Sequence, residues 1–258
     1  MAPAVTSTSV PTTLLEAYEA THVHAIYDRI ALHFSSTRYK PWPIIASFLE
    51  GLEDGWVGLD SGTGNGKYLP LPLDRPGRLW TIGLDRSRNL LQIAQLAGGT
   101  EREVVWGDVL GSAWRHEIFD YAISIATIHH LATPDRRKLA VEKLLSAVSP
   151  NHGRVLVYVW AVRQDEQSKR DIPTDPASSG SGQDVFVPWV MSDKTQVFNR
   201  YYHMFEDGEL ASLVVLAAEG LGLVVGSPSE TAGLKGVEIR QNGWERSNHY
   251  VELRRWQT

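Results

Sequence analysis

Apolar residues along the chain fall into short runs typical of strands and longer stretches with helical spacing. Seven short runs bounded by turn residues predict strands over residues 56–60, 79–85, 103–106, 121–125, 155–160, 223–226 and 249–254. Helical spacing and helix start signals predict helices over residues 18–32, 41–52, 88–97, 133–148 and 207–219. Such alternation places a sheet between two layers of helices. The sequence therefore predicts an α/β fold with a seven-stranded, mostly parallel, Rossmann-like sheet and helices on both faces.

The remaining segments predict a tail and a long loop. Residues 1–13 are rich in Ala, Ser, Thr, Val and Pro and predict a disordered tail, so we expect residues 14–258 to form a single domain. Residues 163–184 are charged and then rich in Pro, Ser and Gly, and two interpretations are open. They form either a solvated linker or a flexible flap over an active site, because ligands of such sheets bind at the carboxyl ends of the strands.

Composition narrows the class of protein. The apolar content of 43% can fill a sizeable core, and no run of about 18 apolar residues predicts a membrane-spanning helix. The absence of cysteine excludes disulfides and cysteine-based zinc sites, and it fits a cytoplasmic or nuclear protein; we expect no metal site. Because the formal net charge is −5, a nucleic acid would need a local basic patch to bind.

A glycine-rich turn follows the first predicted strand. Gly62, Gly64 and Gly66 stand at every second position and let the backbone pass close to a ligand. Asp60 precedes them, and a carboxylate there suits an ammonium or sulfonium group better than a phosphate. A dinucleotide-binding turn would need glycine at position 67, where Lys67 stands. The turn therefore favours S-adenosylmethionine as the cofactor.

Three further strand ends carry groups that suit this cofactor. Asp85, about 20 residues after the turn, can accept hydrogen bonds from both ribose hydroxyls. Asp108 ends the third strand and can accept from an adenine amino group, although an aspartate after glycine is also common in a plain turn. Ala126 ends the fourth strand. The predicted cofactor-binding residues are Asp60, Gly62, Gly64, Gly66, Asp85, Asp108 and Ala126.

Six runs of the sequence match a known family. They are HFSSTRYKPWP (33–43), GNGKYL (64–69), SIATIHHL (124–131), VYVWA (157–161), DVFVPW (184–189) and RYYHMF (200–205). On these runs the chain resembles the fungal tRNA wobble-uridine methyltransferases. The resemblance implies a S-adenosylmethionine-dependent enzyme that esterifies the carboxylate of 5-carboxymethyluridine at the tRNA wobble position. Ser61 and Thr63 stand where the family usually has valine and cysteine, but a cradle built of backbone needs neither side chain.

The resemblance also implies two macromolecular partners. One is the tRNA anticodon loop, and the other is a small zinc-ribbon activator subunit that covers apolar surface beside the third strand. Residues that could supply an exposed apolar edge there are Leu90, Leu91, Ile93, Leu96, Val104, Val105 and Trp106. Ordinary core packing is the alternative for the same residues, because apolar faces are common on helices.

An acceptor carboxylate is already ionised at neutral pH, so this reaction needs a cation to hold the acceptor and no general base. The resemblance and this charge requirement give four candidate catalytic residues, Arg29, His129, Arg200 and His203. Basic and aromatic side chains bind unpaired nucleotides, and the candidates for that role are Arg38, Tyr39, Lys40, Trp42 and Tyr202. Structural alternatives are an exposed helix cation for Arg29, a loop cap for His129 and a core residue for Tyr202.

Two other functions fit parts of the pattern. A methyltransferase for quinone- or sterol-type small molecules would suit the negative net charge, whereas the basic and aromatic run at residues 38–42 favours RNA. A Rossmann-like binding module without catalysis would need no cations near the pocket, and this chain has several candidates.

Overall fold

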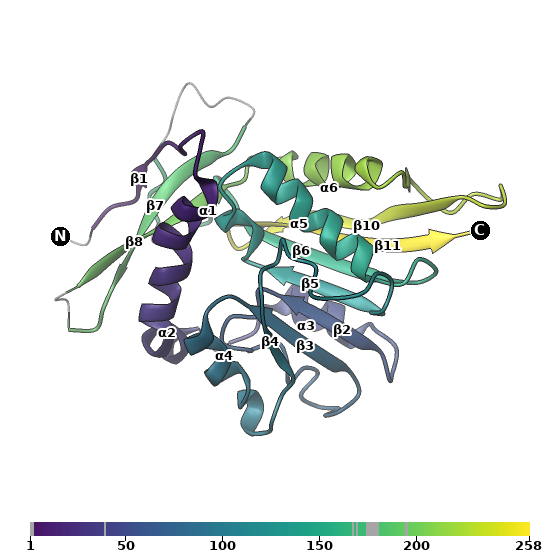
Figure 1. Ribbon diagram of the computed structural model, residues 1–258, viewed down its shortest axis with the longest axis horizontal. Coiled ribbons are helices and arrows are strands. Elements are labelled where there is room, and N and C mark those ends of the chain that lie inside the picture. Colours follow the sequence, from purple (N-terminus) through teal and green to yellow (C-terminus); the bar gives the residue numbers. More distant parts are fainter. Residues whose placement is uncertain (1–2, 39, 167, 169, 174–180, 194–195) are drawn as a thin grey trace.

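The computed structural model describes residues 3–38, 40–166, 168, 170–173, 181–193 and 196–258. Its centre is an eight-stranded sheet in the order β4-β3-β2-β5-β6-β11-β10-β9 (Figure 1). The strands are β2 (Val57–Ser61), β3 (Trp80–Asp85), β4 (Val104–Trp106), β5 (Tyr121–Ile125), β6 (Arg154–Trp160), β9 (Val224–Val225), β10 (Lys235–Glu245) and β11 (Asn248–Gln257). The five strands from β4 to β6 in this order run parallel, and β11 joins β6 antiparallel. The predicted α/β, Rossmann-like fold is confirmed, and the number of strands in the central sheet is corrected from seven to eight.

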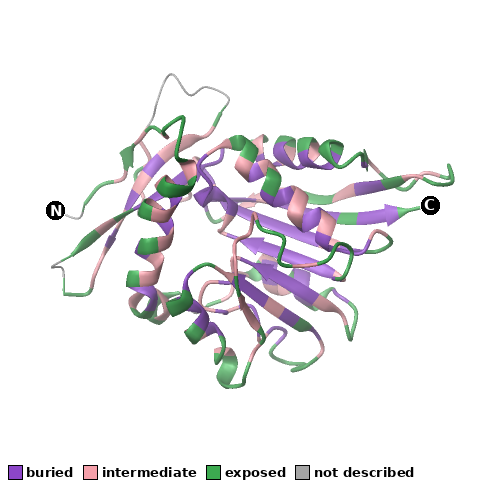
Figure 2. Cartoon of the chain, viewed as in Figure 1, coloured by how far each residue is buried: buried purple, intermediate pink, exposed green. Residues whose placement is uncertain are grey.

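Helices cover both faces of this sheet. The helical elements are α1 (Leu15–Glu19), η1 (Ala20–His24), α2 (Ala25–Thr37), α3 (Pro43–Glu50), α4 (Arg88–Ala94), η2 (Ala97–Gly99), η3 (Ile128–His130), α5 (Pro134–Ala147) and α6 (Glu209–Gly220). Of these, α5 and α6 pack on one face of the sheet and α3 packs on the other. Side chains of β6 alternate between two cores: Val155 and Val157 pack with α5 and α6, whereas Leu156 and Tyr158 pack with α3. Each such buried side chain stabilises the fold by roughly 1.5–3 kcal/mol. Figure 2 shows the result, with central strands buried and the outer helix faces exposed.

A second, smaller sheet has the order β1-β7-β8 and lies beside the N-terminal helices (Figure 1). Its strands are β1 (Thr6–Ser7), β7 (Gln183–Val190) and β8 (Val197–Met204). β1 pairs with β7 inside the stretch for which the sequence predicts a disordered tail. The predicted flap over residues 163–184 runs into β7, while its residues 167, 169 and 174–180 lie outside the described part of the chain. Trp189 of β7 packs against α2, which fixes this sheet to the rest of the molecule.

The N-terminal helical segment is longer than the predicted helix over 18–32 and is not a uniform α-helix. A π-helical turn, η1, separates α1 from α2. Such turns insert an extra residue into a helix and are frequent at functional sites. Here the turn includes Val23 and His24, which line the cavity described below.

The unexpected strand of the central sheet is β10, which forms a hairpin with β11. Its two-residue turn is Arg246-Ser247, both with positive φ, a conformation that usually selects Asn-Gly or Asp-Gly. The turn signal is therefore missing from the sequence, and the polar composition of β10 hides the strand further. None of the helices in the described part of the chain has the length and apolar character that a bilayer crossing requires.

Candidate active site

A cavity of about 1240 Å³, including its open mouth, lies at the carboxyl ends of β2, β3 and β5. Parallel strands direct their carboxyl ends to one edge of the sheet, which is where ligands of such folds bind. The glycine turn after β2 and the loops after β3 and β5 line one part of the cavity. The side chains that line it from outside the central sheet include Val23, His24, Tyr27, Phe34, Arg200 and Tyr202.

The glycine turn is fixed to β3 by hydrogen bonds. The backbone N–H groups of Gly62 and Thr63 both donate to the Leu84 carbonyl, at 2.8 and 2.9 Å. The N–H of Gly64 donates to Oδ2 of Asp85 at 2.8 Å. Gly62 and Gly64 have φ values of +87° and +57°, in the left-handed region that glycine adopts without strain. The turn is thus a rigid backbone cradle beside the cavity.

The two glycines of this turn give a matched pair of predictions. An added Cβ at Gly64 would meet no other protein atom within 4 Å, whereas at Gly62 it would overlap the Thr127 side chain. We expect Gly64→Ala to lose about 1–2 kcal/mol of stability, from its backbone conformation alone, and to weaken cofactor binding at least tenfold. Gly62→Ala should lose about 2–4 kcal/mol of stability. Urea unfolding measures the stability of both variants, and calorimetric titration with S-adenosylhomocysteine measures their cofactor affinity. Equal losses of stability in the two variants would contradict the expected extra cost of the overlap with Thr127 in Gly62→Ala.

Asp60 offers a negative charge to the cavity. Its side chain is 1% exposed, and Oδ2 accepts a 2.7 Å hydrogen bond from the Thr63 hydroxyl. Oδ1 is buried and has no hydrogen-bond partner within the described residues. A buried, unpartnered carboxylate oxygen beside a cavity fits a cationic ligand group, because desolvated charges need an opposite charge nearby. The residues present therefore fit S-adenosylmethionine, which carries both ammonium and sulfonium charge.

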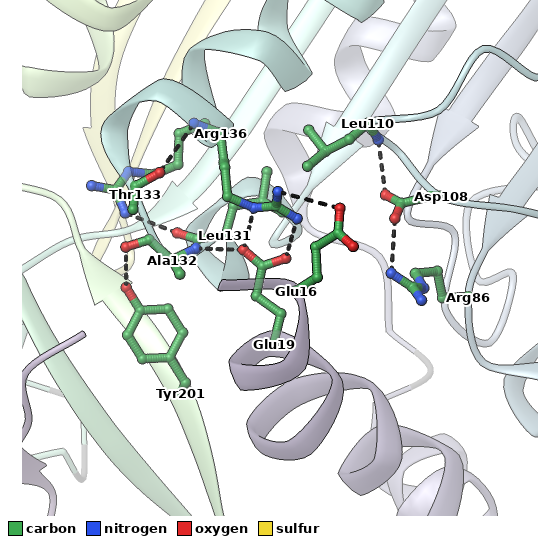
Figure 3. A network of polar contacts seen from close by, with 11 residues as sticks. Glu16, Glu19, Arg86, Asp108, Leu110, Leu131, Ala132, Thr133, Arg136 and Tyr201 are labelled. Atoms are coloured by element: carbon green, nitrogen blue, oxygen red, sulfur yellow. Dashed lines mark hydrogen bonds and ion pairs between the residues drawn. The ribbon is translucent and has the colours of Figure 1, made fainter. Parts of the chain in front are cut away.

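Of the other predicted cofactor residues, Gly62, Gly64, Asp85, Asp108 and Ala126 also line this cavity. Gly66 is not part of the lining and packs against Ala94 of α4. Each oxygen of Asp85 accepts one backbone N–H, from Gly64 and Ser87, and each retains a lone pair that a ribose hydroxyl can use. Asp108 accepts from the Leu110 N–H at 2.9 Å and forms a 2.8 Å ion pair with Arg86 (Figure 3). Asp108 therefore both stabilises the turn after β4 through its hydrogen bond to Leu110 and lines the cavity. Ala126 has a positive φ of 55°, which turns its backbone along the cavity.

Burial raises the pKa of Asp60 to about 7, with the neighbouring Asp85 charge adding to the effect and the Thr63 hydrogen bond opposing it. The ionised form attracts a cationic cofactor and the protonated form does not. As the pH falls below about 7, we therefore expect the affinity for S-adenosylmethionine to fall by up to roughly tenfold per pH unit. Calorimetric titrations between about pH 6 and 7.5 test this, with Asp60→Asn as the control. An equally steep pH dependence in Asp60→Asn would assign the effect to another group.

Arg200 is a buried cation that lines the cavity. It is 4% exposed, and Nη1 donates a 3.1 Å hydrogen bond to the Tyr27 hydroxyl. The guanidinium lies over the rings of Trp189 and Tyr202, at 4.8 and 5.2 Å from their centroids. Nε has no partner, and no carboxylate of the described residues lies within 4 Å of it. Arg200 is therefore a buried charge that still has free donors for an anion.

His129 also presents a donor. It is fully buried on η3 and lines the cavity. Burial lowers the pKa of His129 well below its usual value, and the nearby charges of Arg170 and Arg200 act in the same direction, so the ring is neutral. Nδ1 accepts the Trp160 N–H at 3.1 Å, which assigns the ring proton to Nε2. Nε2 has no partner within the described residues, and it is the donor that the sequence hypothesis requires.

Two predicted catalytic residues do not join this group. His203 follows Tyr202 on β8 and projects to the other face of the strand, where its two ring nitrogens meet Asp184 and Glu209. Arg29 is exposed on α2 with its guanidinium 4.8 Å from the Phe198 ring centroid, outside the lining of the cavity. For Arg29 the structure shows the alternative of an exposed helix cation.

The predicted RNA-binding residues are partly brought together. Arg38 and Trp42 line the cavity, and Trp42 stacks on Tyr158 with ring centroids 4.7 Å apart. Tyr202 lines it as well, stacked on Trp160 at 4.3 Å. Lys40 is exposed and is not part of the lining, and Tyr39 lies outside the described residues.

Sequence reasoning missed several cavity residues, above all Tyr27, His130 and Lys67. Lys67 lies 4.5 Å from the Trp42 ring centroid, and burial lowers its pKa to about 8. Its position in the glycine turn was the available signal. Tyr27 and His130 carried no local signal, because Tyr27 matches a helix core position and adjacent histidines are an uncommon metal spacing.

Fold and site together define a S-adenosylmethionine-dependent methyltransferase of the α/β class. A family model described as "Methyltransferase domain" matches residues 59–151. The fold is similar to that of the 1,6-didemethyltoxoflavin-N1-methyltransferase of Burkholderia thailandensis, with a TM-score of 0.62 at 17% identity over 98% of this chain and 95% of that one. It is also similar to the CcbJ methyltransferase of Streptomyces caelestis, with a TM-score of 0.57 at 12% identity over 92% of this chain and 97% of that one.

Curated relatives define the family. A Schizosaccharomyces pombe protein named tRNA (carboxymethyluridine(34)-5-O)-methyltransferase is 36% identical over 252 residues, 91% of this chain and 96% of its own length. Proteins of the same name from Saccharomyces cerevisiae and Arabidopsis thaliana are 42% and 47% identical. These matches cover 67% and 58% of this chain, but only 58% and 35% of the relatives. The chain belongs to the tRNA (carboxymethyluridine(34)-5-O)-methyltransferase family, which confirms the family that its sequence motifs indicate.

Proposed function

We propose that this protein transfers the methyl group of S-adenosylmethionine to the carboxylate of 5-carboxymethyluridine at the wobble position of tRNA. The observation that carries the proposal is Arg200, a buried cation at the cavity with no carboxylate of the described residues to balance it. Leaving a charge buried without a partner costs several kcal/mol, so such a group is typically completed by a ligand of opposite charge. A small acceptor carboxylate is such a ligand.

The rest of the cavity supports transfer to a carboxylate rather than to a neutral hydroxyl or amine. His129 and His130 are neutral at physiological pH because burial lowers the pKa of both. Nδ1 of His129 already accepts the Trp160 N–H, and Nδ1 of His130 contacts the Tyr201 carbonyl. An ionised acceptor needs no proton removed, so the site has to hold and orient it and to exclude water. S-adenosylmethionine, when bound, supplies the electrophilic methyl group.

Aromatic and basic groups around the mouth support a nucleotide substrate. Trp42 and Trp160 line the cavity, and Arg38 and Lys67 add positive charge in a chain of net charge −5. Stacking on an aromatic face contributes about 1–3 kcal/mol per base. We propose that these groups hold the unstacked anticodon nucleotide whose carboxylate reaches Arg200.

A zinc-ribbon activator subunit beside β4 is part of the proposal. β4 is the edge strand, and Leu96 and Trp106 near it are 64% and 60% exposed. Leu90 and Leu91, which the sequence also offered for this surface, are 3% and 6% exposed and belong to the core. Helix α4 turns these two side chains inward, so an apolar docking surface would be narrower than expected. Co-purification of the chain with such a subunit, and its loss in Trp106→Asp, tests the docking.

Methyl transfer itself tests the proposed function. The purified chain, alone and with its partner, is incubated with labelled S-adenosylmethionine and tRNA that carries unesterified 5-carboxymethyluridine. Label that enters tRNA and is released by mild alkali identifies a methyl ester and supports the proposal. Label that enters a lipid extract and not the tRNA would assign the protein to the small-molecule methyltransferases.

A further inference from the structure

We propose that Tyr27, held by His130, is a positioning residue that aims the Arg200 guanidinium at the acceptor carboxylate. The inference rests on the proposed function and assigns the N-terminal helix a part in acceptor recognition. Tyr27 is the point at which three elements of the site meet. Its hydroxyl lies 3.1 Å from Nη1 of Arg200, 2.8 Å from the Tyr202 hydroxyl and 3.0 Å from Nε2 of His130.

The direction of each hydrogen bond in this group follows from the contact between His130 and the Tyr201 carbonyl. Nδ1 of His130 lies 2.8 Å from the Tyr201 carbonyl, which can only accept, so Nδ1 carries the ring proton. Burial, with the Arg200 charge adding to it, lowers the pKa of His130 to about 3, and the ring is therefore neutral. Nε2 must then accept, and the donor that meets it among the described residues is the Tyr27 hydroxyl, at 3.0 Å.

With its proton given to His130, the Tyr27 oxygen can only accept. It accepts one hydrogen bond from Nη1 of Arg200 and one from the Tyr202 hydroxyl. The single proton of Tyr202 is thereby used within the protein, so Tyr202 has no donor left for a bound anion. Among the described residues that line the cavity, the buried donors without a partner at this end include Nε of Arg200 and Nε2 of His129. Tyr27 therefore fixes both the orientation of Arg200 and the donor pattern that an acceptor meets.

The helix that carries Tyr27 is anchored on both sides of it. One anchor is Glu19, whose carboxylate accepts from the Ala132 N–H at 2.8 Å and from two nitrogens of Arg136 at 2.7 Å each (Figure 3). The other is Asp28, which accepts from the Ser87 hydroxyl at 2.8 Å and from the Asn89 N–H at 3.0 Å. A side chain between two such anchors is held by its surroundings before substrate binds, as a positioning residue must be.

Tyr27→Phe tests the inference because it removes the hydroxyl and keeps the ring. Affinity is measured, with S-adenosylhomocysteine present, for two anticodon stem–loops, one with 5-carboxymethyluridine and one with its neutral amide. Wild type should prefer the carboxylate, and Tyr27→Phe should lower this preference about tenfold while affinity for the amide stays unchanged. Tyr250→Phe, a tyrosine whose hydroxyl has no hydrogen-bond partner within the described residues, should match wild type.

Two further comparisons separate positioning from simple damage. In an Arg200→Gln background, adding Tyr27→Phe should leave the preference unchanged, because the hydroxyl acts only through Arg200. Equal losses of affinity for carboxylate and amide would show a merely structural role and overturn the inference, as would a wild-type preference in Tyr27→Phe. If wild type itself binds both stem–loops alike and forms no ester, the proposed function fails, and that outcome is distinct from the other two.

Discussion

Arg200→Gln is expected to lower kcat/KM for tRNA by roughly 30- to 1000-fold while leaving affinity for S-adenosylhomocysteine unchanged. Losing one member of a buried charge pair costs about 2–4 kcal/mol, which converts to that range. In the proposed site the other member is the acceptor carboxylate, so the cost should fall on substrate rather than on the fold. Steady-state kinetics with tRNA, and calorimetric titration with the cofactor product, measure the two quantities.

The stability of the same variant gives an independent check. Arg200 is 4% exposed with no balancing carboxylate among the described residues, so a neutral side chain removes an uncompensated buried charge. We therefore expect the free energy of unfolding of Arg200→Gln to equal or exceed that of wild type. Arg255→Gln is the matched control, because Arg255 is also 4% exposed and its Nη1 donates to the Leu145 carbonyl at 2.7 Å, away from the cavity. That variant also removes a buried cation, so its stability should change in the same direction as that of Arg200→Gln, but it should keep its kcat.

Arg200→Lys refines this prediction. Lysine keeps the charge but cannot donate to Tyr27 and grip a carboxylate with the fixed fork of a guanidinium. Activity between that of wild type and Arg200→Gln is therefore expected. Wild-type activity in Arg200→Gln would remove Arg200 from acceptor binding altogether and leave His129 as the candidate donor.

The cofactor half of the site was predictable because it depends on local sequence. Asp60, Asp85 and Asp108 follow three strands whose carboxyl ends meet at one edge of a parallel sheet, and all three line the cavity. Glycines in the turn reveal a conformation that few other residues adopt. Strand ends and glycine turns are short-range features, and the sequence displays them directly.

The acceptor half depends on long-range contacts that the sequence does not display. Tyr27 meets His130 and Tyr202 across 103 and 175 positions of the chain. Its place in an amphipathic helix makes it look like an ordinary core residue. The neighbouring sequence does not distinguish a tyrosine that only packs in the core from a tyrosine that positions a charged side chain.

His203 does not reach the cavity, contrary to the prediction, for a simpler reason. Side chains alternate along a strand, so Arg200 and Tyr202 face the cavity while Tyr201 and His203 face away. The strand β8 is absent from the elements that the apolar pattern predicts, and without it Arg200, Tyr202 and His203 look like one group. Once these residues are assigned to a strand, its two-residue period places Arg200 and Tyr202 on one face and His203 on the other.

On its own face of β8, His203 joins two carboxylates. Nδ1 lies 2.9 Å from Oδ1 of Asp184 and Nε2 lies 2.7 Å from Oε1 of Glu209. Both ring nitrogens therefore lie at hydrogen-bond distance from a carboxylate oxygen, and the ring links β7 to α6. Glu209 also accepts from the Gly182 and Glu206 N–H groups, which ties the end of the 163–184 segment to the same cluster.

His203→Gln is expected to lower the free energy of unfolding by about 3–5 kcal/mol at neutral pH. The substitution removes the ring that contacts both carboxylates of a largely buried cluster and leaves them without this hydrogen-bond partner, the costly way to break such a contact. His152→Gln is the matched control, since His152 also meets a carboxylate, Asp120, at 2.8 Å but is 45% exposed. A surface pair contributes about 1 kcal/mol or less. Urea unfolding of the three proteins measures the difference.

Acid titration tests whether His203 keeps the carboxylates of Asp184 and Glu209 ionised. Burial alone would raise the pKa of Asp184 and of Glu209, but hydrogen bonds and nearby charges together outweigh burial and lower both. His203 is the first of these contributors for each carboxyl; Tyr201 and Arg137 also act on Asp184, and the Glu206 N–H and Arg137 also act on Glu209. Depressed carboxyl pKa values contribute stability that is complete above their ordinary values of 3.8 and 4.5 and is lost as the pH falls through the folded-state values. Wild type should therefore lose stability below about pH 4.5, and His203→Gln should lose much less over the same range. Parallel acid curves for the two proteins would mean that His203 does not hold these carboxylates ionised, and β8 would then owe its position beside the cavity to apolar packing alone.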